Sequence, residues 1–156
     1  MKSESEQKAA PTQAELKHTA IDLLSRRDHS CHELKQKLQL KGGDADDIAA
    51  VIEWCTHENY QSDSRYCAML VRAKANKGYG PAVVSQAARE QGIDRELLTQ
   101  TLEELEIDWF ALALSQYQKK FADKPITDYQ DKQKRMGFLQ RRGFNSAQIQ
   151  YALKPE

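Results

Sequence analysis

The stretch GIDRELL, residues 92–98, decides the fold because its pattern occurs three times in the chain. Gly92 follows a predicted helix, where a glycine can adopt the left-handed conformation that ends the helix. Asp94 comes two residues later, where its side-chain oxygen can cap the start of the next helix. Leu98 and Leu102 then share one face of that helix because they are four residues apart. The stretch therefore predicts a helix end, a tight turn and a new helix.

Two other stretches carry the same glycine, cap and apolar pair in the same order. The three copies consist of Gly42, Asp44, Ile48 and Ile52; Gly92, Asp94, Leu98 and Leu102; and Gly143, Asn145, Ile149 and Leu153. A match at turn, cap and core positions together is harder to produce by chance than a match of hydrophobicity alone, and its period of about fifty residues indicates a structural repeat.

The remaining apolar residues also recur at helical spacing, and no stretch alternates as a strand does. We therefore predict an all-α fold of about nine helices, in three tandem three-helix repeats. Because a unit of this size buries little surface alone, the repeats should lean on one another in an elongated, curved array; a single compact bundle is the alternative. The expected parts are a disordered leader (1–13) and three repeats (14–60, 61–107 and 108–156).

The composition is that of a soluble globular protein. Of the 156 residues, 40% are hydrophobic and 29% are charged, and 23 Lys and Arg balance 23 Asp and Glu, so no global field attracts nucleic acid or a membrane. No apolar run reaches the roughly 18 residues that a membrane span needs, and we expect a cytoplasmic protein. The three cysteines form no recognisable framework, which favours reduced thiols.

The charges are unevenly distributed along the chain. Residues 64–89 carry five cations and no carboxylate, residues 94–108 are mainly acidic, and residues 119–142 are basic again. Such runs are often only solvated helix faces. Here, however, Tyr66 and Tyr79 lie among the cations of the first run, and the turn KGYGP, residues 77–81, would present a cation and a ring at a helix start. This combination favours a contact surface for a protein or for nucleic acid.

Residues for catalysis or for metal binding are not arranged in any known pattern. His29, Cys31, His32, Cys55 and His57 do not have the spacing of a zinc site, and the residue after His29 reads as a helix cap. No nucleophile with a base and no phosphate-binding loop is present. The sequence therefore predicts no catalytic residue, metal or cofactor. Both tryptophans are expected in packing between helices.

Three segments resemble the RecX family. They are residues 27–38, with RDHS followed by EL and KL; residues 58–66, with ENY followed by DSRY; and residues 77–93, with KGYGP followed by QGI. The resemblance runs from about residue 15 to the C-terminus, and it implies a modular fold of three-helix repeats. It also implies a protein that binds RecA filaments on single-stranded DNA, along the filament groove. Such a protein restrains ATP hydrolysis, strand exchange and the coprotease reaction by blocking filament extension or by promoting disassembly, and it has no catalytic residues.

We expect the contact residues on the basic runs, with the first run as the main face. They are Arg26, Arg27, Lys35, Arg65, Tyr66, Arg72, Lys74, Lys77, Tyr79, Arg89, Lys132, Arg135, Arg141 and Arg142. The expected partners of the monomer are the RecA filament and, weakly, single-stranded DNA, with double-stranded DNA as a further ligand. Two alternatives remain: a helix-turn-helix-like DNA-binding protein, which would prefer one duplex sequence, and an adaptor for an unrelated protein.

Overall fold

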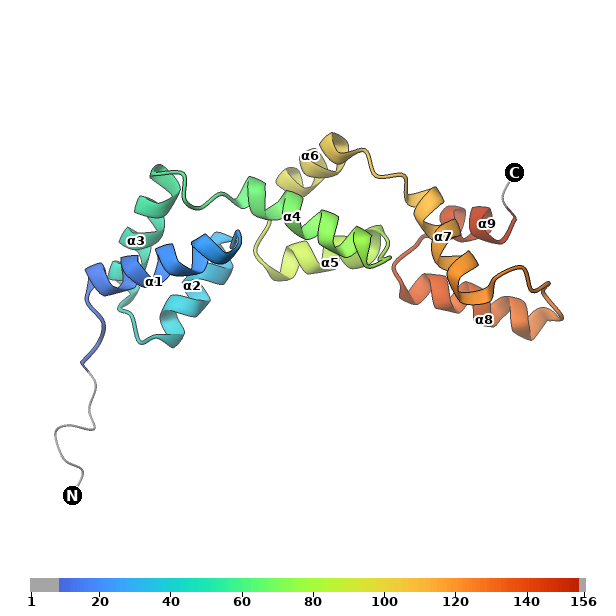
Figure 1. The fold of residues 1–156 in the computed structure, drawn as a ribbon, viewed down its shortest axis with the longest axis horizontal. Helices are drawn as coiled ribbons and strands as arrows, with labels where there is room; N and C mark the ends of the chain where they lie inside the picture. Colours follow the sequence, from blue (N-terminus) through green and yellow to red (C-terminus); the bar gives the residue numbers. More distant parts are fainter. Residues whose placement is uncertain (1–8, 155–156) are drawn as a thin grey trace, which may run out of the picture. The chain divides into compact units, whose positions relative to one another are not determined.

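The computed structural model describes residues 9–154, which form nine α-helices and no strand (Figure 1). This confirms the all-α prediction of nine helices in three groups of three. The helices are α1 (Gln13–Arg26), α2 (Cys31–Leu40), α3 (Ala45–His57), α4 (Asp63–Asn76), α5 (Pro81–Glu90), α6 (Arg95–Leu105), α7 (Trp109–Phe121), α8 (Tyr129–Arg141) and α9 (Ser146–Leu153). None of these helices is long and apolar enough to cross a membrane.

The three repeated turns have the conformation that the sequence predicts. Gly42, Gly92 and Gly143 have φ values of 86°, 76° and 101°, in the left-handed region that favours glycine. In each turn the residue after the glycine donates its N–H to a carbonyl five positions earlier, at 3.2, 3.0 and 3.2 Å, which closes the preceding helix. The predicted caps are also present, because Asp44, Asp94 and Asn145 accept backbone N–H groups of the following helices.

By its internal contacts the chain divides into two compact units, residues 1–66 and residues 67–156. The first unit contains α1, α2, α3 and the first turn of α4. Its core is formed by residues spaced three or four apart on each of the three full helices: Leu16, Ala20, Leu34, Leu38, Ile48, Val51 and Cys55. Each large aliphatic side chain buried in this way contributes about 1.5–3 kcal/mol. Burial of these side chains is the main source of the first unit's stability.

The second unit contains the rest of α4 and the helices α5–α9. One core of this unit lies where α7 packs against α8 and α9, and consists of Ala113, Tyr117, Leu139, Phe144, Ile149 and Ala152. In the second repeat, Thr101 is the one buried residue of α6. Leu98, which corresponds to the buried Ile48 and Ile149 of the other copies, is only half-buried.

Only part of the predicted leader can be compared with the structure, since residues 1–8 lie outside the described residues. Thr12 caps α1 in a capping box with Glu15, so α1 begins at Gln13. None of the three cysteines forms a disulfide, and two of them, Cys55 and Cys67, are buried. Burial raises the pKa of the Cys31 and Cys55 thiols, which leaves both poorly suited to nucleophilic chemistry.

Candidate interaction surface

The turn between α4 and α5 is built by the predicted glycine-flanked sequence. Gly78 has a φ of 88°, and the N–H groups of Gly78 and Tyr79 donate to the carbonyls of Ala75 and Lys74 at 2.9 and 3.1 Å. Pro81 follows as the first residue of α5, a position that its fixed φ suits. Tyr79 therefore projects from a tight, well-defined turn.

This turn is joined to the turn between α8 and α9 by two backbone hydrogen bonds. The N–H of Gly80 donates to the Arg142 carbonyl at 2.7 Å, and the N–H of Ala82 donates to the Gly143 carbonyl at 3.0 Å. The approach is so close that a Cβ added to Gly80 would lie 2.6 Å from the Gly143 carbonyl carbon, and a Cβ added to Gly143 would lie 2.7 Å from the Val83 nitrogen. The second and third repeats are thus in direct backbone contact inside the second unit.

The contact between these turns brings cations and aromatic rings together in a row, which we call the stacked basic cluster. The Arg142 guanidinium lies 5.1 Å from the centre of the Tyr79 ring and 5.5 Å from the centre of the Phe138 ring. Lys74 contributes its ammonium 5.5 Å from the Tyr79 ring, and Lys120 contributes its ammonium 5.6 Å from the Phe138 ring. Each distance is within the range of a cation–π interaction, so the two rings hold three cations close together.

No carboxylate of the described residues forms an ion pair with this cluster. Among the described residues, the ion pairs are Arg26–Asp22, Arg27–Glu33, Arg65–Asp28 and Arg135–Asp131. None of them involves Lys74, Lys120 or Arg142. Lys77 is exposed beside the cluster, and its carbonyl accepts a hydrogen bond from Arg142 at 3.3 Å. Four neighbouring cations without a paired carboxylate make a local positive field, which suits an anionic partner surface.

The other predicted contact residues fall into two groups. In the first unit, Arg26, Arg27, Lys35 and Arg65 are all exposed, and the three arginines take part in ion pairs. In the second unit, Arg72, Arg89 and Arg141 are exposed and Lys132 is half-buried. The structure therefore brings together Lys74, Lys77, Tyr79 and Arg142 and does not draw the remaining residues into their cluster.

Two of the predicted contact residues are buried, which corrects the prediction for them. Tyr66 is only 3% exposed and Arg135 only 4%, so neither side chain is available on the surface. Tyr66 lies on the inner face of α4, where an aromatic ring contributes more by burial than by exposure. Both residues are excluded from the surface proposed below.

Arg135 instead holds the segment that joins α7 to α8. Its guanidinium donates to the Tyr117 hydroxyl at 2.8 Å, to the Lys124 carbonyl at 2.8 Å and to the Pro125 carbonyl at 3.2 Å. An ion pair with Asp131 at 3.0 Å completes the set. The planar guanidinium can satisfy all four acceptors at once, which an ammonium group could not do.

Lys120 and Phe138 belong to the cluster, but the sequence did not indicate them. Phe138 and Arg142 are four residues apart at the end of α8, so their contact follows from helix geometry. The pairing of Phe138 with Lys120 on α7 depends on how the two helices pack, and no local pattern reveals it.

A polar junction around His29 lies in the first unit. His29 is 2% exposed; its Nδ1 is 3.0 Å from the Arg27 carbonyl, and its Nε2 is 3.0 Å from the Lys37 ammonium. Both ring nitrogens are therefore occupied in a neutral imidazole that donates from Nδ1 and accepts at Nε2. Among the described residues, no three His, Cys, Asp or Glu side chains lie together as metal ligands would.

We expect the first unit to lose stability as the pH falls from about 7 to about 5. Burial lowers the pKa of His29 below its ordinary value, and the nearby Arg27 and Lys37 cations add to this effect. The unfolded chain therefore takes up a proton more readily than the folded chain. The stabilisation that neutral His29 provides is complete above the pKa that His29 has in the unfolded chain. It is lost as the pH falls through the lower pKa that His29 has in the folded chain. Urea unfolding followed by Trp54 fluorescence, in a Trp109→Phe background, measures the stability of the first unit at each pH. His29→Gln should flatten the pH dependence; an equally steep dependence in this variant would assign the effect to other groups.

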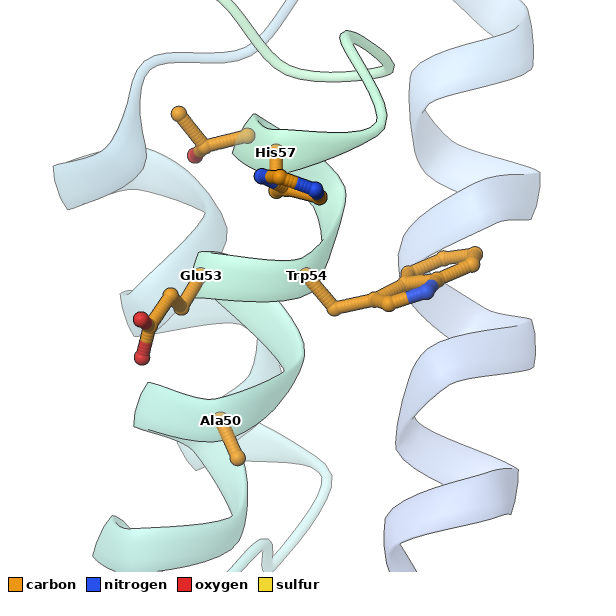
Figure 2. A pocket seen from close by; sticks show the side chains of 5 residues that line it. Ala50, Glu53, Trp54 and His57 are labelled. Carbon is orange, nitrogen blue, oxygen red and sulfur yellow. The ribbon is translucent and has the colours of Figure 1, made fainter.

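A shallow hollow of about 650 Å³ lies on the outer face of α3, lined by Ala50, Glu53, Trp54, Thr56 and His57. Figure 2 shows Trp54 turned across the neighbouring helix and away from Glu53. The Lys17 ammonium lies 3.9 Å from the centre of the indole, and the Tyr60 ring lies 5.4 Å away. Trp54 also packs against the core of the first unit, which confirms the predicted packing role. Trp109 is half-buried at the start of α7.

Comparison with known proteins gives a match for each of the three groups of helices. Family models described as the first, second and third three-helix domains of RecX match residues 17–55, 62–102 and 106–153. The chain is 39% identical over 151 residues to the regulatory protein RecX of Vibrio parahaemolyticus, covering 97% of each chain. It is 37% identical over 150 residues to that of Escherichia coli strain SE11, covering 90% of each. The crystal structure of RecX from Lactobacillus salivarius shares the fold, with a TM-score of 0.78 at 21% identity, over 91% of this chain and 94% of that chain.

Proposed function

Because this chain belongs to the RecX family of regulatory proteins, we propose that it is a negative regulator of the RecA recombinase. In this proposal it binds the RecA filament on single-stranded DNA in the cytoplasm and lowers its ATPase, strand-exchange and coprotease activities. It does so by blocking filament extension or by promoting disassembly. The observation that carries the proposal is the stacked basic cluster, a set of unpaired cations on a backbone-to-backbone junction.

The cluster suits a nucleoprotein filament for two physical reasons. A filament presents phosphates and carboxylates, and cations that lack an internal partner gain most from such a surface. The rings of Tyr79 and Phe138 also hold Arg142 before the partner arrives, so less side-chain entropy is lost on binding. A preorganised guanidinium beside a fixed turn is therefore a better docking element than the same charge on a mobile side chain.

A binding role without catalysis agrees with the state of the reactive side chains in the described residues. Both nitrogens of His29 are engaged, and burial raises the pKa of the Cys31 and Cys55 thiols. In this proposal the regulator acts through binding contacts, with no catalytic step of its own.

The test is ATP hydrolysis by preformed RecA filaments on single-stranded DNA, with this protein added far below the RecA concentration. Loss of hydrolysis that excess DNA does not relieve supports a filament-directed regulator and favours capping of the growing end. No inhibition at equal concentrations contradicts the proposal and favours the DNA-binding or adaptor alternative.

Reversing three cations of this surface should abolish most of the inhibition. The variant Lys74→Glu, Lys77→Glu, Lys120→Glu leaves Arg142 and the turn in place but replaces attraction by repulsion. We expect the concentration for half-inhibition to rise about tenfold to a hundredfold, since each surface charge contact is worth up to about 1 kcal/mol. The matched control is Lys41→Glu, Lys134→Glu, Lys154→Glu, which makes the same change of net charge at exposed lysines outside the cluster. Equal inhibition by both variants would remove the cluster from the contact surface.

A further inference from the structure

A second candidate surface is a groove in the second repeat, between α5 and α6, whose positions in the fold Figure 1 shows. It has a volume of about 610 Å³, and its lining includes Arg89, Ile93, Arg95, Leu98 and Leu102. None of these residues belongs to the stacked basic cluster. The groove is therefore a surface distinct from the stacked basic cluster.

The apolar floor of the groove arises from the way in which the second repeat departs from the other two. At the corresponding position of the repeat, Ile48 is 1% exposed and Ile149 is 5% exposed, so both are core residues. Leu98 and Leu102 are only half-buried and line the groove beside Ile93. Leu98, at a position that completes a core in the other two repeats, thus leaves apolar surface open to water, a feature typical of a binding site. Leu102 adds to this surface, although Ile52 and Leu153 at its position in the other repeats are half-buried as well.

Two cations without carboxylate partners lie among the groove's lining residues. Arg89 is in the last turn of α5 and Arg95 is the first residue of α6, and both are exposed. Neither takes part in an ion pair among the described residues.

The nearby carboxylates do not line the groove. Glu90 accepts a hydrogen bond from Gln86 at 3.0 Å. Glu96 and Glu103 line a separate shallow depression, which Arg95 borders as well. The groove itself therefore combines an apolar floor with positive charge.

We propose that this groove binds a segment of a protein partner that is both apolar and acidic. Carboxylates of the segment pair with Arg89 and Arg95, and its apolar side chains cover Ile93, Leu98 and Leu102. The floor holds no aromatic ring on which a base could stack, which favours a polypeptide over single-stranded nucleic acid. The proposal does not depend on the identity of the partner, and so it is independent of the function proposed above.

The experiment titrates the full-length ¹⁵N-labelled chain with three synthetic peptides of about twelve residues and follows the amide resonances. The first peptide has leucines at helical spacing among glutamates, the second has lysine for every glutamate, and the third has serine for every leucine. We expect only the first to bind, with shifts centred on residues 89–102. Arg89→Glu, Arg95→Glu should weaken its binding about tenfold or more, whereas Lys41→Glu, Lys154→Glu, with the same change of net charge, should not.

Several results would overturn the proposal. One is an absence of binding of the acidic leucine peptide at about 1 mM, the limit of a useful contact. Others are equally tight binding of the lysine or serine peptide, shifts that lie outside residues 89–102, and equal affinity of the two charge-reversed variants. Circular dichroism of both variants checks that the helical content is retained. The ATPase assay with RecA is a separate readout, so a failure here leaves the stacked basic cluster untouched.

Discussion

Gly143→Ala will destabilise the second unit by about 2–4 kcal/mol. Two costs combine at this position. The φ of 101° lies in the region that alanine rarely adopts, and the new Cβ would lie 2.7 Å from the Val83 nitrogen. Because the neighbouring atom is backbone, it cannot rotate away, and the two turns must separate. That separation would also lengthen the two hydrogen bonds that join them.

Urea unfolding followed by Trp109 fluorescence, in a Trp54→Phe background, measures this loss in the second unit. Gly137→Ala is the matched control, because Gly137 lies inside α8 and its added Cβ would meet only the end of the Arg141 side chain, at 3.2 Å. Alanine favours a helix interior over glycine by about 0.5–1 kcal/mol, so this control should be neutral or stabilising. If the two variants had the same stability, the close contact between the turns would have no energetic weight.

Arg135→Ala is expected to lower the melting temperature of the second unit by about 10 °C or more. The substitution leaves the Tyr117 hydroxyl and the carbonyls of Lys124 and Pro125 without their donor. It also leaves Asp131 without its ion-pair partner and opens space beneath the segment that joins α7 to α8. Loss of a buried donor is costly because the acceptors that remain have given up their contacts with water.

The melting experiment distinguishes this structural role from a binding role. Arg141→Ala removes an exposed cation from the same helix and should leave the melting temperature within about 2 °C of the parent. Tyr117→Phe removes only one acceptor of the network and should fall between the two. A normal melting temperature for Arg135→Ala, together with lost inhibition of RecA, would return Arg135 to the contact surface.

The sequence predicted the helices well because their signals are local. A glycine that needs a positive φ and a cap that follows two residues later act within one turn of the chain, as at Gly92 and Asp94. The same local logic predicted the shape of the turn around Tyr79. The exact limits of the repeats and their elongated, curved arrangement stay predictions.

The parts of the candidate surface that sequence reasoning missed depend on packing between distant segments. Tyr66 and Arg135 lie among basic residues in the sequence, yet folding turns both inward. Lys120 joins the cluster only because α7 places it beside Phe138. Sequence reasoning also missed that Leu98 lines an open groove, because the sequence pattern around Leu98 is the same as that of the buried copies. Periodicity shows which face of a helix is apolar but not what covers that face.

The close approach of the Gly80 and Gly143 backbones limits how interchangeable the repeats are. At the corresponding turn of the first repeat, a Cβ added to Gly42 would meet only Pro11, at 3.8 Å. Among the described residues of the first unit, that turn makes no comparable fit with a second backbone. A chimaera that takes its third repeat from a relative must therefore bring a matching second repeat, with glycine at both positions. Exchange of repeats between such proteins is thus restricted to exchanges that transfer the second and third repeats together.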